Sequence, residues 1–167
     1  MSGFNTQLND ALPDLWRYAF SLTRNSASAD DLVQDCVERA LRKRWLWLSS
    51  KPLKPWLARI MLNIYRNQMK ANETRSYVQY DETLHLSCPS NPEDRVELTE
   101  LLKNIDNLPN DQKEALLAVT VGGMDYKEAS DALCIPIGTL MSRISRARAK
   151  LRVRDKPLHK PNIRSVK

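Results

Sequence analysis

Arginine and hydroxyl side chains cluster in the segment IPIGTLMSRISRARAKLR, residues 135–152. Its apolar residues recur at helical spacing and form one stripe: Ile137, Leu140, Ile144, Ala147 and Leu151. The opposite face carries hydrogen-bond donors and few acids: Thr139, Ser142, Ser145 and Arg146, with Met141, Arg143 and Arg148 on its flanks. Hydroxyl and guanidinium groups bind phosphates and base edges in a DNA major groove. The alternative is the solvated face of an ordinary amphipathic helix.

The residues before this segment favour the DNA-binding alternative. Asp125 and Glu128 have the spacing of a capping box, which predicts that a short helix begins there. The sequence Cys134-Ile135-Pro136 then predicts a tight turn before the basic helix. Two short helices across a tight turn, the second of them basic, are typical of a DNA-binding helix-turn-helix.

A second polar surface is predicted on a helix from about Ser28 to Trp47, with Ser28 as its N-terminal cap. Its apolar stripe includes Leu32, Cys36 and Leu41. The opposite side forms a mainly acidic ridge of residues that lie three or four positions from another member: Asp31, Gln34, Asp35, Glu38 and Arg42. Such a ridge is usually a solvated helix face, and its spacing alone does not indicate a partner.

A third surface mixes cations with amides on a helix predicted from about Pro55 to Lys70. The face opposite its apolar stripe holds Arg59, Asn63, Arg66, Asn67 and Lys70, with the rings of Trp56 and Tyr65 nearby. Cations along a backbone and aromatic contacts to bases are typical of single-stranded DNA binding. Trp56 fits a core position equally well.

The apolar spacing is helical almost throughout, which predicts an all-α fold of two small helical domains joined by a linker. A further helix is expected from about Gln7 to Thr23. The expected divisions are a first domain at 1–71, a linker at 72–90, a four-helix domain with the helix-turn-helix at 91–155, and a basic tail at 156–167. In the second domain, Asn91 is expected to cap a helix with Pro92 in its first turn, and another helix follows Leu108-Pro109-Asn110.

Composition excludes several functional classes. A net charge of +6 and the concentration of bases near the C-terminus are compatible with nucleic-acid binding. No apolar run or leader pattern indicates a membrane span or a signal peptide, and the 3 cysteines suggest reduced thiols in the cytoplasm, with Cys36 and Cys134 buried. His85 and Cys88 are half of a metal site without a second pair. We expect no catalytic site, cofactor or metal.

Three segments resemble extracytoplasmic-function (ECF) RNA polymerase sigma factors, members of the sigma-70 superfamily. Residues 138–148, GTLMSRISRAR, are similar to the family's Gly-Thr-Val-x-Ser-Arg-x-x-Arg-Ala-Arg pattern. Residues 29–41, ADDLVQDCVERAL, are similar to its Ala-Glu-Asp-Leu-Val-Gln-Glu segment, and residues 55–63, PWLARIMLN, to its Trp-Leu-x-Arg-Ile-x-x-Asn segment. The three matches occur in the family's order and span most of the chain.

The resemblance implies promoter-specific transcription initiation with RNA polymerase core, through its β′ and β subunits. It assigns β′ docking to Asp31, Gln34 and Asp35, and we extend this expectation to Glu38 on the same ridge. It assigns the −10 element to the loop 49–54 and to Trp56, Arg59, Asn63, Arg66 and Asn67. It assigns the −35 element to the face of the last helix: Thr139, Met141, Ser142, Arg143, Ser145, Arg146 and Arg148. It also implies an anti-sigma partner.

Two alternatives remain at this stage. One is a helix-turn-helix regulator that acts on duplex DNA without polymerase core, which the ridge at Asp31 to Asp35 argues against. The other is a sigma-like decoy for an anti-sigma factor, which the retained Arg143, Arg146 and Arg148 argue against.

The family often has a basic residue where Met141 stands and an aromatic or histidine at Ser145, so an unusual −35 sequence is expected.

Overall fold

The computed structural model describes residues 3–73 and 103–154, and these residues form helices and turns without a strand. The elements are α1 (Phe4–Thr23), α2 (Ser26–Arg42), the 3-10 helix η1 (Arg44–Leu46), α3 (Leu53–Glu73), α5 (Asn110–Thr120), α6 (Tyr126–Leu133) and α7 (Ile137–Arg154). Residues 103–106 are also helical. The predicted all-α class is confirmed. The α3 helix continues to Glu73, two residues past the expected end of the first domain, because its helical hydrogen bonding continues there. The rest of the expected linker and most of the helix after Asn91 lie outside the described residues.

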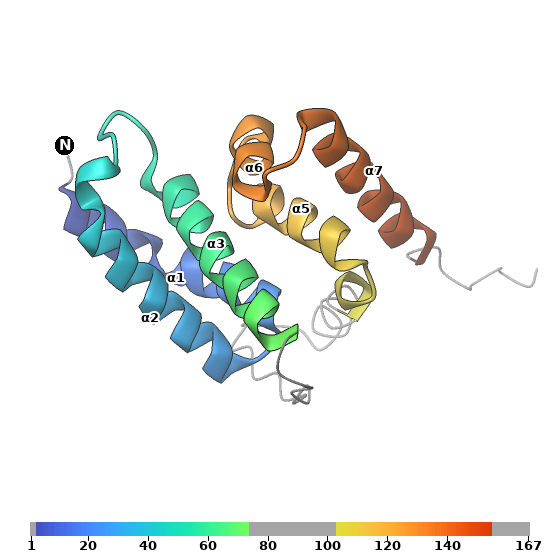
Figure 1. Cartoon of the computed structure of the whole chain (residues 1–167), viewed down its shortest axis with the longest axis horizontal. Helices are drawn as coiled ribbons and strands as arrows, with labels where there is room; N and C mark the ends of the chain where they lie inside the picture. Colours follow the sequence, from blue (N-terminus) through green and yellow to red (C-terminus); the bar gives the residue numbers. More distant parts are fainter. Residues whose placement is uncertain (1–2, 74–102, 155–167) are drawn as a thin grey trace, which may run out of the picture.

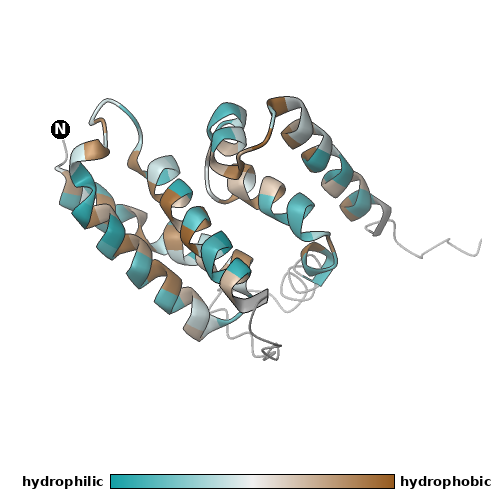
Figure 2. Ribbon diagram, viewed as in Figure 1, coloured by the Kyte–Doolittle hydropathy of each residue, from teal (hydrophilic) through white to brown (hydrophobic). Residues whose placement is uncertain are grey.

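The N-terminal domain consists of α1, α2 and α3, which pack against one another in all three pairings (Figure 1). Its core includes Leu15 from α1, Leu32 and Cys36 from α2, and Leu57 and Met61 from α3, all nearly inaccessible to solvent. Figure 2 shows hydrophobic and hydrophilic residues on different sides of these helices, as their sequence periodicity requires. The domain therefore holds α2 and α3 side by side with their polar faces outward.

The described part of the C-terminal domain contains α5, α6 and α7, and its helix-turn-helix is fixed by local hydrogen bonds. The Asp125 side chain accepts a hydrogen bond from the Glu128 amide at 2.7 Å, and the Glu128 side chain accepts one from the Asp125 amide at 3.0 Å. The predicted capping box is thus confirmed. At the other end of α6, Cys134 adopts a left-handed conformation with φ of 55°. This residue turns the chain into α7, where Leu140 is fully buried.

Several local predictions were wrong. Asn25, not Ser28, caps α2, because its side chain accepts a hydrogen bond from the Ser28 amide. The helix ends at Arg42, and Leu41 in its last turn is 44% exposed because the chain leaves the bundle there. Ile137 is 46% exposed because it occupies the first turn of α7, at the edge of the domain. Cys134 is exposed because the left-handed turn directs its side chain outward, whereas Cys36 is buried as predicted.

The two domains pack against each other through α3 and α1 on one side and α5 and α6 on the other (Figure 1). A Cβ atom at Gly122 would lie 3.3 Å from the Ala58 Cβ and 2.6 Å from the Ala118 carbonyl oxygen, so only glycine fits this approach between α3 and the turn after α5. Gly123, with φ of +70°, lies against the Lys54 side chain. The interface is therefore closely packed where α3 begins.

Candidate promoter and polymerase interfaces

The basic face of α7 is exposed over most of its length. The exposed members of the predicted −35 set are Thr139, Met141, Ser142, Ser145, Arg146 and Arg148. The other side of the helix is held in the core by Leu140, Ile144 and Ala147, each no more than 2% exposed. Burial of this stripe fixes the rotation of α7, and the hydroxyl and guanidinium donors consequently point to solvent.

Arg143 is the exception on this face. Its Nε lies 3.2 Å from Oδ2 of Asp111 on α5, and its side chain is only 26% exposed. The guanidinium therefore already has an anionic partner from its own domain. Beside it, a groove runs between the start of α6 and α7, lined by Tyr126, Met141, Ser145 and Arg148 among others.

The acidic ridge lies on the outer side of α2. Asp31, Gln34, Asp35 and Glu38 are all exposed, and α2 packs mainly against α1 and α3. Two of these side chains have neighbours within the domain. Asp35 accepts a hydrogen bond from the Gln68 amide group at 3.2 Å, and Glu38 forms an ion pair with Arg42 one turn later. Both contacts are exposed and are therefore weak enough to exchange for a partner protein.

The polar face of α3 is divided between open and engaged residues. Arg59, Asn63 and Asn67 are exposed. Arg66 is partly buried, because it donates a hydrogen bond to the Leu133 carbonyl at 3.1 Å and forms a 3.5 Å ion pair with Glu114. Both partners belong to the C-terminal domain. The structure thus brings the predicted −10 residues onto one helix face and places one of them in the domain interface.

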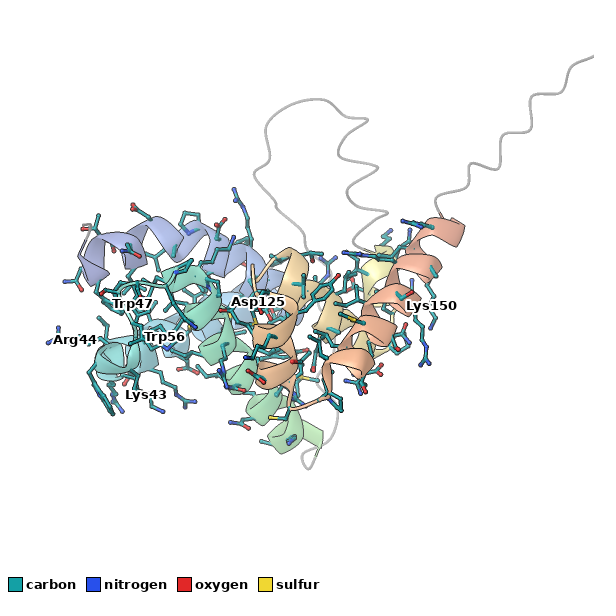
Figure 3. The ribbon with its side chains drawn as sticks, turned by 90° about the horizontal axis from the view of Figure 1, so that it is seen from above. Lys43, Arg44, Trp47, Trp56, Asp125 and Lys150 are labelled. Atoms are coloured by element: carbon teal, nitrogen blue, oxygen red, sulfur yellow. The ribbon has the colours of Figure 1, made fainter. Side chains whose placement is uncertain are left out.

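Trp56 is half-buried, which lies between the two positions that the sequence left open. The Trp56 ring makes an edge contact with the Phe4 ring at a centroid distance of 6.3 Å. The Phe4 ring also makes an edge contact with Trp47, at a centroid distance of 5.6 Å. Trp56 also lines a cavity of about 400 Å³ together with Arg59 of α3 and Asp125, the N-cap of α6. Figure 3 shows Trp47 and Trp56 close together, with Asp125 at the start of the neighbouring α6.

Sequence reasoning missed an apolar surface on the segment that connects α2 to α3. Trp45 is 76% exposed and Leu48 is 63% exposed, beside the exposed Leu46 of η1. Lys43 and Arg44 extend into solvent at the same end of the domain (Figure 3). The signal was present in KRWLWL, residues 43–48, where two bases precede alternating tryptophan and leucine. The prediction of one continuous helix as far as Trp47 concealed it.

The remaining titratable groups in the described residues do not assemble a metal site. Within residues 3–73 and 103–154, no three His, Cys, Asp or Glu side chains are grouped to hold a metal ion. His85 and Cys88 lie outside these ranges. None of the helices in the described segments has the length and apolarity needed to cross a membrane.

Comparison with known proteins accounts for both domains. Residues 8–62 match the family described as the Sigma2 domain of PhyR, and residues 98–151 match Sigma-70, region 4. The fold and its surfaces therefore define a two-domain protein of the sigma-70 class. The ECF RNA polymerase sigma factor EcfG of Rhodopseudomonas palustris is 34% identical over 84% of this chain and 78% of its own length. The chain belongs to the ECF family of RNA polymerase sigma factors, and it is an alternative sigma factor that recognises promoters.

Solved structures agree with this assignment. The sigma factor RpoE of Bartonella quintana, in complex with the anti-sigma factor NepR, superposes with a TM-score of 0.77 at 28% identity and covers 92% of this chain and 98% of that one. CnrH, in complex with the cytosolic domain of CnrY, superposes with a TM-score of 0.63 at 25% identity over 90% of this chain and 85% of that one.

Proposed function

We propose that three surfaces divide promoter recognition among them. The α2 ridge of Asp31, Gln34, Asp35 and Glu38 docks on the β′ subunit of polymerase core. The α3 face of Trp56, Arg59, Asn63, Arg66 and Asn67, with the loop before it, binds and opens the −10 element. The α7 face of Thr139, Met141, Ser142, Arg143, Ser145, Arg146 and Arg148 binds the −35 element. The first domain extends through α3 to Glu73, two residues past the boundary expected at 71. The linker then runs to residue 90, the second domain covers 91–155, and the basic tail is 156–167.

One observation carries this division: in both α7 and α2 the apolar face is buried and the polar face is exposed. Leu140 and Ile144 lie in one core and Leu32 and Cys36 in the other. The basic face of α7 and the acidic face of α2 consequently stay open to partners of opposite charge. DNA phosphates fit the first face, and a basic protein surface fits the second.

The protein acts in the cytoplasm, where bacterial promoters are transcribed, and it regulates transcription without being an enzyme. Its activity is controlled by an anti-sigma factor, a proposal that rests on the likeness to RpoE of Bartonella quintana, solved with the anti-sigma factor NepR. A sigma-like decoy is less favoured. Although residues 8–62 match the Sigma2 domain of PhyR, the region 4 match and the curated sigma-factor relatives favour promoter recognition.

The −35 assignment predicts two kinds of arginine on α7. Changing Arg146 to Ala should cost about 1–3 kcal/mol at the preferred −35 sequence and relax discrimination at one base pair, because Arg146 faces outward near the middle of the helix. Changing Arg148 to Ala should lower the affinity for all sequences alike, because Arg148 lies on a flank where phosphate is its partner. The slope of the logarithm of the binding constant against the logarithm of the salt concentration should become shallower by about one. Titrations of the full chain against −35 variants at several salt concentrations measure both effects. If Arg146→Ala has the affinity and base preference of the wild type, this face of α7 is a solvated surface and does not bind the −35 element.

The −10 assignment predicts a defect in strand opening. Asn63→Ala should impair open-complex formation and leave −35 duplex binding close to wild type, because Asn63 is exposed on α3, away from α7. Permanganate reactivity of unpaired thymines in complexes with core measures opening, and Asn9→Ala on the exposed side of α1 is the matched control. Normal opening by Asn63→Ala would remove this residue from the −10 surface.

A further inference from the structure

Two exposed apolar residues interrupt the polar surface of α7. Ile137 is 46% exposed and Met141 is 47% exposed, and they lie about one helical turn apart on the same side of the helix. A single exposed apolar side chain is ordinary on a protein surface. This pair, however, occupies the N-terminal half of α7, and the N-terminal residues of a recognition helix are the ones that contact base edges in the major groove. The apolar pair therefore lies where a nucleobase is read.

The edge of α7 that carries Met141 is open, whereas the other edge is occupied. Arg143 lies two residues later, on the other edge, and its Nε is 3.2 Å from Oδ2 of Asp111 on α5. The Met141 edge instead borders a groove beside the start of α6, which packs against α7 (Figure 1). The described residues that line this groove combine apolar with basic side chains and include no acid, among them Tyr126, Met141, Ile144, Arg148 and Arg152. An apolar wall with positive charge beside it is complementary to a nucleobase and its phosphates.

Gly138 indicates that a partner approaches this part of the helix closely. A Cβ atom added there would meet no protein atom within 4 Å, so packing within the domain does not require a glycine. Its backbone conformation does not require one either, because Gly123 is the glycine with a positive φ in the described residues. Glycine is less favourable than alanine in a helix. A glycine that the fold does not need, three residues before Met141, is expected where a ligand comes close to the backbone.

We propose that Met141, with Ile137 one turn before it, contacts the C5-methyl group of a thymine in the −35 element. The inference rests on the proposed assignment of α7 to that element, and it names one base within the element. In the major groove thymine presents a methyl group, and apolar side chains recognise thymine through it. Methionine has no hydrogen-bond donor and only a weakly accepting sulfur. It therefore cannot form the paired hydrogen bonds by which arginine selects guanine or asparagine selects adenine.

The polar residues on the same edge position the duplex without selecting this base. Arg148 is exposed about two turns after Met141, and a guanidinium bound to phosphate carries no sequence information. Ser145 is exposed about one turn after Met141, and its hydroxyl group can bond to more than one kind of base. Met141 is consequently the residue on this edge that discriminates between bases.

Uracil tests this contact, because it differs from thymine by the methyl group alone. The duplex is the −35 sequence that the full wild-type chain prefers, selected from a randomised pool. Each thymine of either strand is replaced in turn by deoxyuridine, which leaves base pairing unchanged. At one position the wild-type affinity should fall about fourfold, the effect of one methyl group that is no longer buried. Equal affinity for the thymine duplex and every uracil duplex, or a preferred −35 sequence without thymine on either strand, would overturn the inference.

Variants at position 141 assign the effect to this side chain. Met141→Ala should bind the thymine and uracil duplexes equally, whereas Met141→Leu keeps an apolar contact and should retain a preference for thymine. Because Met141 is about half exposed, both variants should keep the wild-type circular dichroism spectrum. Leu48→Ala, a matched loss of an exposed apolar side chain in the N-terminal domain, should keep the full preference. A thymine preference that persists undiminished in Met141→Ala would refute the role of Met141.

The proposed function is judged separately, by whether the affinity and base preference of the chain depend on Arg146. Arg146-dependent binding of the preferred duplex without any preference for thymine over uracil would refute the inference alone. Binding that does not depend on Arg146 would contradict the −35 assignment on which the inference rests.

Discussion

Replacing Leu140 with Asp should unfold the C-terminal domain. Leu140 is fully buried between α7 and the rest of its domain, so the substitution loses apolar burial and places a carboxylate in the core without a designed partner. We expect a loss of about 3–5 kcal/mol, a large part of the free energy of unfolding of a small domain. Circular dichroism of the full chain during urea titration should show reduced helicity before denaturant is added.

Ser142→Asp is the control for this experiment. It introduces the same group two residues later on the exposed face of α7, where a carboxylate stays hydrated. Its urea midpoint should remain close to wild type, although its DNA binding should fall because the new charge repels phosphates. Equal midpoints for wild type and Leu140→Asp would mean that the buried stripe has been assigned to the wrong face, and the −35 surface with it.

The second large effect concerns polymerase. Asp31→Arg together with Asp35→Arg should reduce association with core about 100-fold, because two attractive contacts become repulsive. Both side chains are exposed, and the contact of Asp35 with Gln68 is an exposed one, so stability should change by less than about 1 kcal/mol. Fluorescence titration with purified core measures the affinity, and circular dichroism checks the fold.

A matched comparison separates docking from a general change of charge. Asp31→Arg alone is compared with Asp10→Arg, which makes the same change on the exposed side of α1. The first should weaken binding to core and the second should not. Wild-type affinity of the Asp31 and Asp35 double variant would remove the ridge from the polymerase interface.

Local sequence patterns were sufficient to predict the α-helices of residues 3–73 and 110–154 and most of their orientations. The capping box at Asp125 depends on residues three apart, and the stripe containing Leu140 and Ile144 depends on helical periodicity, so both are visible without a tertiary structure. Errors occur at the ends of helices. Leu41 and Ile137 continue their stripes correctly, but each extends past the neighbouring helix that would cover it.

The contacts of Arg66 could not be predicted in the same way. Its position on the polar face of α3 follows from periodicity, but its partners Glu114 and Leu133 come from another domain and depend on how the two domains pack. Arg143 and Asp111 are likewise far apart in sequence. Sequence patterns therefore identified the residue types of the candidate surfaces, whereas only the structure showed which of those residues are already engaged.

Run-off transcription with purified core polymerase on genomic fragments tests the central claim most directly. With the wild-type chain we expect discrete transcripts that core alone does not produce, with start sites preceded by shared −35 and −10 sequences. Asp31→Arg with Asp35→Arg should abolish these transcripts, and Arg146→Ala should reduce them according to the −35 sequence. A wild-type chain that binds core and yet yields only the transcripts of core alone would contradict the account.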